Sequence, residues 1–313
     1  MRSLKSYVPL VVAIAVLLGV FRLWVPRFLY AENLLDLAQQ ISVNAILAFG
    51  MTLVILIGGI DLSVGAVVAL VGTVTVWLLP QAGLIPSVAA GLGVAALFGA
   101  VNGTLAARTT MPPFIITLAT MQIARGVALR FNRGQPISVP ADATAFEVLG
   151  NYRLLGVLPV PVVLMAATFV VSWVLLHRTR FGQHLYAIGG NREAARLVGI
   201  RLEAHETAVY ILCGLFAGLS GLIHASQLYS AEPGSAVGYE LNAIAAVVVG
   251  GTSFTGGIGS VAGTMLGAVI IGILDKGLNQ AGVHFSLQSI VKGSVLLAAV
   301  YLDVRRRQHA GGR

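Results

Sequence analysis

Three carboxylates in or beside apolar sequence are the residues that could do chemistry. Asp61, Glu240 and Asp275 each lie in or next to a long apolar run, and an ionisable group at membrane depth is costly unless it is paired or faces a cavity. Such carboxylates could bind a coupling proton or cation. Asp61 also allows a structural interpretation, because Asp61 or Ser63 could cap a helix that restarts after paired glycines in the segment 58–65. If that break lies within the membrane, it must be buried in protein or line a cavity.

No other pattern in the chain indicates a reaction. The glycine-rich stretch at 250–259 lacks the Lys-Ser or Lys-Thr pair of a Walker A nucleotide cradle. The histidines show no metal-ligand spacing, no Ser/His/Asp arrangement is legible, and Cys213 is the only cysteine. We therefore expect no catalytic residue, no metal site and no cofactor held by this chain, and we expect Cys213 to be a small core residue.

The elements that position these residues must be membrane-spanning helices. Of the 313 residues, 57% are hydrophobic and 10% are charged, and the mean hydropathy is +0.88. Long apolar runs predict about ten spans in an all-α, polytopic transmembrane bundle, treated as a single transmembrane domain over 1–313. The segments 58–65 and 239–257 are candidate broken or re-entrant helices. The runs lie at about 7–24, 34–57, 64–79, 84–107, 114–129, 158–176, 207–226, 239–250, 260–274 and 287–302.

The positive charge is best explained by membrane orientation. A net charge of +8 could indicate a nucleic-acid partner in a soluble protein, but here the basic residues occupy short loops between apolar runs, so we expect no nucleic acid. An even number of spans with both termini inside gives the cytoplasmic side the excess of Lys and Arg. That set is Arg2, Lys5, Arg108, Arg178, Arg180, Arg192, Arg196, Arg201, Arg305, Arg306, Arg307 and Arg313. The smaller outer set is Arg22, Arg27, Arg125, Arg130, Arg133, Arg153 and Lys276.

Two long loops could receive partners. The outer loop 131–157 could bind a protein or cap a pathway, and the inner loop 177–206 contains a short helix at 191–200. Asn191 can cap this helix, Glu193 complements its dipole and Gly199 suits a left-handed stop. Ala194, Ala195, Leu197 and Val198 give the helix an apolar surface. That surface could dock a protein partner or lie on the bilayer interface.

Several motifs in order resemble one family of transporters. The segment 41–56 followed by 58–65 resembles the signature of ribose/xylose/arabinose/galactoside permeases of ATP-binding-cassette (ABC) importers. The similarity continues through 187–191, 196–200, 238–253 and 290–293. Within the family, similar permeases often carry Asp where this chain has Asn242, so a fixed negative charge is not available there.

The resemblance implies function, location and partners. It implies a bacterial inner-membrane permease that passes a monosaccharide, ribose first, from a periplasmic binding protein to the cytoplasm. A second permease copy, identical or not, and cytoplasmic ATPase subunits that use ATP and Mg complete the assembly. The implied ATPase-coupling residues are Asn191, Arg192, Glu193, Ala194, Ala195, Arg196, Leu197 and Gly199. The candidates for the translocation path or helix break are Asn44, Gly58, Gly59, Asp61, Ser63, Glu240 and Asn242. The alternative from another class is an ion-coupled secondary transporter.

Overall fold

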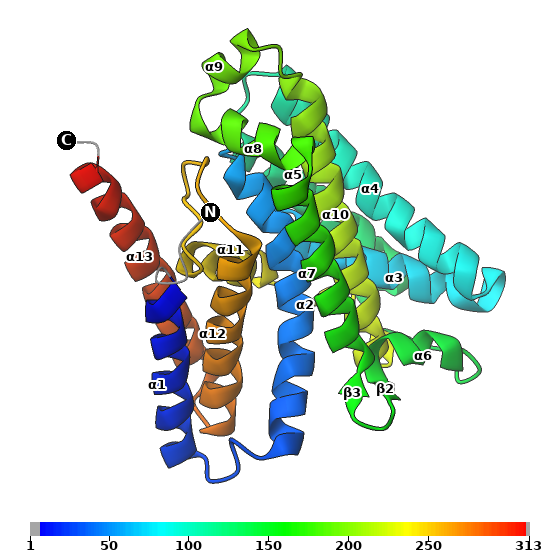
Figure 1. Cartoon of the computed structure of the whole chain (residues 1–313). Helices are drawn as coiled ribbons and strands as arrows, with labels where there is room; N and C mark the ends of the chain where they lie inside the picture. The colour runs from blue at the N-terminus through cyan, green and yellow to red at the C-terminus, as the bar shows by residue number, and fades with distance from the viewer. Residues whose placement is uncertain (1–6, 311–313) are drawn as a thin grey trace.

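A computed structural model describes residues 7–310, with side chains described except at 302 and 306–310, and the chain is a bundle of helices (Figure 1). Each of the ten apolar runs coincides with a helix, so the predicted all-α fold is confirmed. The helices are α1 (Val8–Trp24), α2 (Ala31–Leu56), α3 (Val64–Ala82), α4 (Leu84–Arg108), α5 (Pro113–Arg130), η2 (Phe131–Gly134), α6 (Thr144–Asn151), α7 (Val160–Arg178), α8 (Arg180–Gly190), α9 (Arg192–Leu197), α10 (Leu202–Gln227), α11 (Tyr239–Val249), α12 (Val261–Gln280) and α13 (Phe285–Ala310).

The helices differ in whether they are long enough to cross a bilayer. Among the described residues, eight helices have the length and apolar composition of a span, while α1 and α11 are shorter. The 11 residues of α11 rise about 16 Å, roughly half of a hydrocarbon core of about 30 Å. Because α11 continues into the loop 250–260, the expectation that the segment 239–257 contains a half-length helix is confirmed.

The ends of the bundle agree with the predicted orientation. The helix α1 runs away from the side on which α8 and α9 lie, and α13 runs toward that side, so the start of α1 and the end of α13 face the same side (Figure 1). Arg2, Lys5 and Arg313, which contributed to the charge count, lie outside the described residues. Arg125, an arginine of the outer set, has an internal role, because its Nη1 donates to the carbonyls of Pro233 and Ser235 at 2.9 and 2.6 Å. It therefore fixes the loop before α11.

Glycines let the central helices approach closely. A Cβ built at Gly99 or Gly214 would collide with backbone of the facing helix, at Tyr210 and Ala95 respectively, and one built at Gly103 would lie 2.7 Å from the Cα of Thr207. The helices α4 and α10 thus pack backbone to backbone. The four-residue spacings of Gly99 and Gly103 and of Gly214 and Gly218 predict such close packing, because each pair lies on one face of its helix. Cys213 is buried and free in this core, as expected.

The outer loop 131–157 is folded onto the bundle. It contains the short helices η2 and α6 and the strands β1 (Ile137–Ser138) and β2 (Arg153–Leu154). The strand β1 pairs antiparallel with β4 (Ser230–Ala231), which follows α10, and β2 pairs antiparallel with β3 (Leu158–Pro159), just before α7. Phe146 of α6 is fully buried, and Asn151 donates from Nδ2 to the carbonyl of Ser226 at 2.7 Å. The loop is therefore a structured cover on the outer end of α10.

Candidate functional site

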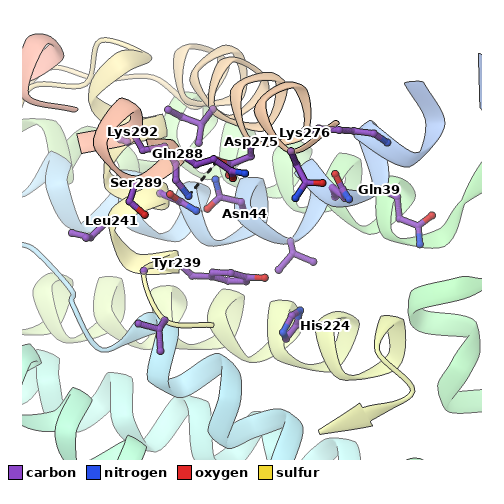
Figure 2. A pocket seen from close by; sticks show the side chains of 18 of the residues that line it. Gln39, Asn44, His224, Tyr239, Leu241, Asp275, Lys276, Gln288, Ser289 and Lys292 are labelled. Atoms are coloured by element: carbon purple, nitrogen blue, oxygen red, sulfur yellow. Dashed lines mark ion pairs between the residues drawn. The ribbon is translucent and has the colours of Figure 1, made fainter. Parts of the chain in front are cut away.

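A polar cavity of about 1200 Å³ lies among α2, α10, α11, α12 and α13 (Figure 2). Asn44 and Asp275 come from α2 and α12 on one wall, whereas His224 of α10 and Tyr239 of α11 lie opposite them. The polar and charged lining residues are Asn33, Asp36, Gln39, Gln40, Asn44, Asn151, His224, Gln227, Tyr239, Asn242, Asp275, Lys276, Asn279, Gln280, Gln288, Ser289 and Lys292. A cavity wall with so many polar side chains, within an otherwise apolar bundle, is suited to a polar solute.

The charges in this wall are largely compensated. Asp275 of α12 pairs with Lys292 of α13, with 3.2 Å between Oδ1 and Nζ. Lys276 donates from Nζ to the carbonyl of Asn33 at 3.0 Å, and Asp36 pairs with Arg153 at 3.2 Å. The cavity therefore offers mainly amide, hydroxyl and imidazole groups, which suit an uncharged solute rich in hydrogen-bonding groups.

Three lining side chains carry unpaired polar atoms. Asn44 Oδ1, His224 Nε2 and Gln227 Nε2 are buried and have no hydrogen-bond partner within the described part of the chain. A buried polar atom without a partner costs about 1–3 kcal/mol. Water or the hydroxyl groups of a solute can supply the missing bonds, so these residues mark where a solute would be held.

The cavity ends at the middle of α2. Asn33 and Asp36 line it at the start of α2 and Asn44 lines it near the centre. Every residue from 45 to 56 is buried, and Thr52 shares a 2.7 Å hydrogen bond with Thr264 of α12. The cavity is thus closed toward α8 and α9 and reaches the opposite, outer end of α2.

The break between α2 and α3 is stabilised by hydrogen bonds around a buried carboxylate. Gly58 has a φ of +82°, and Asp61, 1% exposed, accepts hydrogen bonds from Ser63 N at 2.9 Å and Ser63 Oγ at 2.6 Å. Asn102 Nδ2 donates to Ser63 Oγ at 2.9 Å, and Thr120 Oγ1 donates to Asn102 Oδ1 at 2.7 Å. Such a satisfied network favours the structural interpretation of Asp61 over a charge relay.

Only some of the residues that the sequence analysis proposed for the translocation path line the cavity. Asn44 and Asn242 line the cavity, whereas Gly58, Gly59, Asp61 and Ser63 do not. Glu240 is also absent from the lining, and its Oε1 accepts from Gly238 N at 3.1 Å. Each of the three intramembrane carboxylates thus has a protein partner.

The sequence analysis missed most of the wall, although one signal was present. Asn33, Asp36, Gln40 and Asn44 follow each other at intervals of three or four residues, which places them on one face of a helix. Other parts of the wall come from α10, with His224 and Gln227, and from α13, with Gln288 and Lys292. No local sequence pattern shows that these two helices lie near α2.

Glycines join the closed end of α2 to the inner helices. Gly257 N donates to the carbonyl of Leu56 at 2.8 Å. A Cβ at Gly189, near the end of α8, would collide with that same carbonyl, and one at Gly256 would lie 2.9 Å from it. The end of α2, the end of α8 and the loop before α12 therefore meet through backbone, without intervening side chains. We call Leu56, Gly189, Gly256 and Gly257 the glycine junction.

The inner helix predicted at 191–200 is α9, and its caps are as expected. Asn191 Oδ1 accepts from Ala194 N at 2.9 Å, and Gly199 has a φ of +84°. Arg192 forms an ion pair with Glu206 of α10, a bond that includes a 3.1 Å contact between Nη2 and Oε2. The buried Glu206 therefore anchors the start of α9, a role that the sequence did not reveal.

One expectation about this helix is wrong. Ala195 does not belong to its exposed apolar surface, because its side chain is 3% exposed and packs with Ile188 and Leu202. The helix α9 has only 6 residues, which are too few for the spacing of apolar residues to show which face points inward. The exposed apolar residues are Leu197 and Val198, at 86% and 76% exposure, and Ala194 is also exposed. Ala195 instead holds α9 against its neighbours.

Comparisons with known proteins identify relatives along nearly the whole chain. Residues 33–300 match the family model described as branched-chain amino acid transport system / permease component. The ribose import permease protein RbsC of Escherichia coli (strain K12) is 44% identical over 299 residues, which cover 95% of this chain and 93% of that protein. The corresponding protein of Bacillus subtilis (strain 168) is 45% identical, over 90% of this chain and 87% of its own length. The L-arabinose transport system permease protein AraH of Escherichia coli (strain K12) is 37% identical, over 96% and 91%. No solved structure matches the chain.

Proposed function

The chain belongs to the family of branched-chain amino acid transport system permease components, and from this premise we propose that it passes a monosaccharide through the membrane as the permease subunit of an ABC importer. It is a multi-pass inner-membrane transport subunit rather than an enzyme. The observation that carries the proposal is the polar cavity, which is closed at Asn44 and has unpaired hydrogen-bonding atoms in its wall.

The substrate class follows from the cavity's chemistry together with the relatives. A monosaccharide is uncharged and presents several hydroxyl groups, and each hydroxyl can donate one hydrogen bond and accept others. Asn44, His224, Gln227 and Asn242 supply amide and imidazole partners for them. Because the relatives named above import ribose and L-arabinose, ribose is our first choice and other pentoses or related sugars come next.

Energy and delivery come from other subunits in this proposal. A cytoplasmic ATPase binds ATP and Mg and docks on α9, and a periplasmic binding protein delivers the sugar to the outer side. A second permease copy, as a homodimer or a heterodimer, completes the membrane unit. The docking surface on the ATPase side is formed by Leu197 and Val198, whose exposure is high for apolar side chains.

The glycine junction gives this docking a mechanical consequence. The helix α9 follows α8 directly, and Gly189 of α8 touches the carbonyl of Leu56 at the end of α2. A displacement of α8 and α9 by the ATPase therefore acts on the inner half of α2, the segment that closes the cavity. In this account, ATP-driven motion separates that half from α12 and opens the path inward.

Labelling of introduced cysteines tests this proposal, because the single native cysteine is buried at 1% exposure. Asn44→Cys places a thiol at the closed end of the cavity, and Met51→Cys places one two turns further along α2, where the native side chain is fully buried. The assembled importer is treated with a membrane-impermeant maleimide from the outer side, with and without ribose. The parent chain, which carries Cys213 alone, measures the background.

The expected result is labelling of Cys at position 44 but not at 51 in the resting state, with ribose slowing the reaction at 44. Trapping the complex with ATP and vanadate should prevent labelling of position 44 from the outer side. Equal labelling at both positions from outside, or labelling at 44 that no sugar changes, would contradict the assignment of the cavity as the sugar path.

A further inference from the structure

A second pocket lies on the inner side, apart from the sugar cavity. It has a volume of about 630 Å³ and is lined by the end of α4, the start of α10, two residues of α9 and the segment that joins α9 to α10. Four of its lining residues are arginines and one is a glutamate. The lining residues are Thr104, Ala107, Arg108, Arg192, Arg196, Ile200, Arg201, Leu202, Glu203, Ala204, Thr207, Ala208 and Ile211. The pocket is thus basic and also has apolar walls.

The carboxylates nearby leave an excess of positive charge. Arg108 pairs with Glu203 at 3.3 Å, and Arg192 pairs with Glu206. Arg196 lies 3.9 Å from Glu193, while Arg201 forms no ion pair among residues 7–310. A guanidinium carries five N–H donors and one carboxylate occupies at most two of them, so donors remain for an oxyanion.

An apolar track leads from this pocket along α4. Leu97, Val101, Thr104 and Arg108 recur at intervals of four, three and four residues, so they share one face of the helix. Leu97 and Val101 are 60% and 40% exposed, and α4 as a whole is one of the least buried spans. From Arg108 the track therefore runs toward the middle of the membrane, where acyl chains are the surrounding medium.

We propose that this pocket binds the phosphodiester headgroup of an anionic phospholipid, whose acyl chains lie along the track on α4. Charged donors at the inner end and apolar side chains at membrane depth match the two halves of such a lipid. A basic pocket between the cytoplasmic ends of membrane helices is suited to a lipid phosphate. A docked protein would gain nothing from the apolar track, because that track lies within the bilayer.

Occupancy of this site acts on α9. Arg192 and Arg196 belong to α9 and line the pocket together with Arg108 of α4 and Arg201 before α10. A bound phosphate relieves the repulsion among these arginines and ties α9 to the ends of two spans. The lipid thus stabilises the position of α9, the helix on which the ATPase docks, and this effect does not depend on which sugar is transported.

Lipid binding to the full-length permease tests the site directly. The protein is titrated in detergent with phosphatidylglycerol or phosphatidylcholine of equal chain length, and retained lipid is counted by native mass spectrometry. Two variants, Arg108→Gln and Arg201→Gln, each remove one charge from the pocket. Arg180→Gln is the matched control, because Arg180 is exposed on the same side and does not line the pocket.

We expect one tightly held phosphatidylglycerol, weaker binding by about fivefold for each pocket arginine removed, and no change for Arg180→Gln. Glycerol 3-phosphate, which carries the phosphate without acyl chains, should not displace the lipid. Equal losses for all three variants, equal retention of phosphatidylcholine, or displacement by glycerol 3-phosphate would overturn the proposal. Displacement of the lipid by the ATPase subunit would also overturn it, and would assign the pocket to a protein interface.

Discussion

The exposed end of α9 gives the sharpest prediction about energy coupling. Leu197 and Val198 are 86% and 76% exposed, so nearly all of their apolar surface is available to a docking partner. The double substitution Leu197→Ser and Val198→Ser removes that surface without adding charge. It touches none of the contacts that hold α9, which are made by Ala195, Arg192 and the Asn191 cap.

The magnitude follows from the area that docking would bury. Full burial of a leucine or valine side chain contributes about 1.5–3 kcal/mol. Because a docking interface realises only part of that, we expect the pair to lose about 3 kcal/mol, which corresponds to roughly a hundredfold weaker Kd. The melting temperature of the permease alone should stay unchanged, since both side chains are on its surface.

The assay is a titration of the purified ATPase subunit onto the permease in lipid nanodiscs, with ATP hydrolysis measured in parallel. The control is Leu155→Ser, which makes the same chemical change at a fully exposed leucine of the outer loop, between β2 and β3. It should bind the ATPase like the parent.

A contrasting variant separates docking from folding. Ala195→Asp places a carboxylate at a site that is 3% exposed, where an unpaired charge is strongly unfavourable, so it should lower the melting temperature as well as the ATPase affinity. The reasoning is refuted if the double serine variant binds the ATPase with the parent's affinity, or if Leu155→Ser weakens binding as much.

Two further predictions concern the membrane interior. Asp61→Asn retains an acceptor for the Ser63 backbone and should keep most uptake, whereas Gly59→Leu should abolish it, because a Cβ there would lie 2.6 Å from a buried hydroxyl. Uptake assays at matched membrane levels decide this, and loss in Asp61→Asn alone would favour the charge relay. Asp275→Asn leaves Lys292 unpaired beside the cavity and should cost about 1–2 kcal/mol of stability, more than the double variant Asp275→Asn/Lys292→Gln. Equal melting temperatures of the single and double variants would exclude a stabilising ion pair.

The sequence predicted the helices well because the membrane imposes a strong local rule. A backbone in lipid must satisfy its hydrogen bonds within each span, so every long apolar run had to be a helix. The run ending at Gly250 was too short to cross, and α11 is indeed short. The caps of α9 were also local, since Asn191 and Gly199 act within a few residues of their own positions.

The site was harder to predict because its contacts join distant segments. Asp61 is stabilised through Ser63 by Asn102 and Thr120, which lie on α4 and α5. The polar face of α2 was legible in the spacing of its side chains, but His224 faces it only because α10 packs against α2. Burial of Ala195 likewise depends on the position of α8 and α10, which a six-residue helix cannot encode.

Uptake by reconstituted vesicles tests the central claim most directly. Proteoliposomes are prepared with the permease alone or with its ATPase, and radiolabelled ribose is offered with the binding protein outside. The account predicts accumulation above the external concentration only when the ATPase is present and ATP is inside, with neither accumulation nor ATP hydrolysis by the permease alone. Accumulation by the permease alone, driven by an imposed proton gradient, would contradict it.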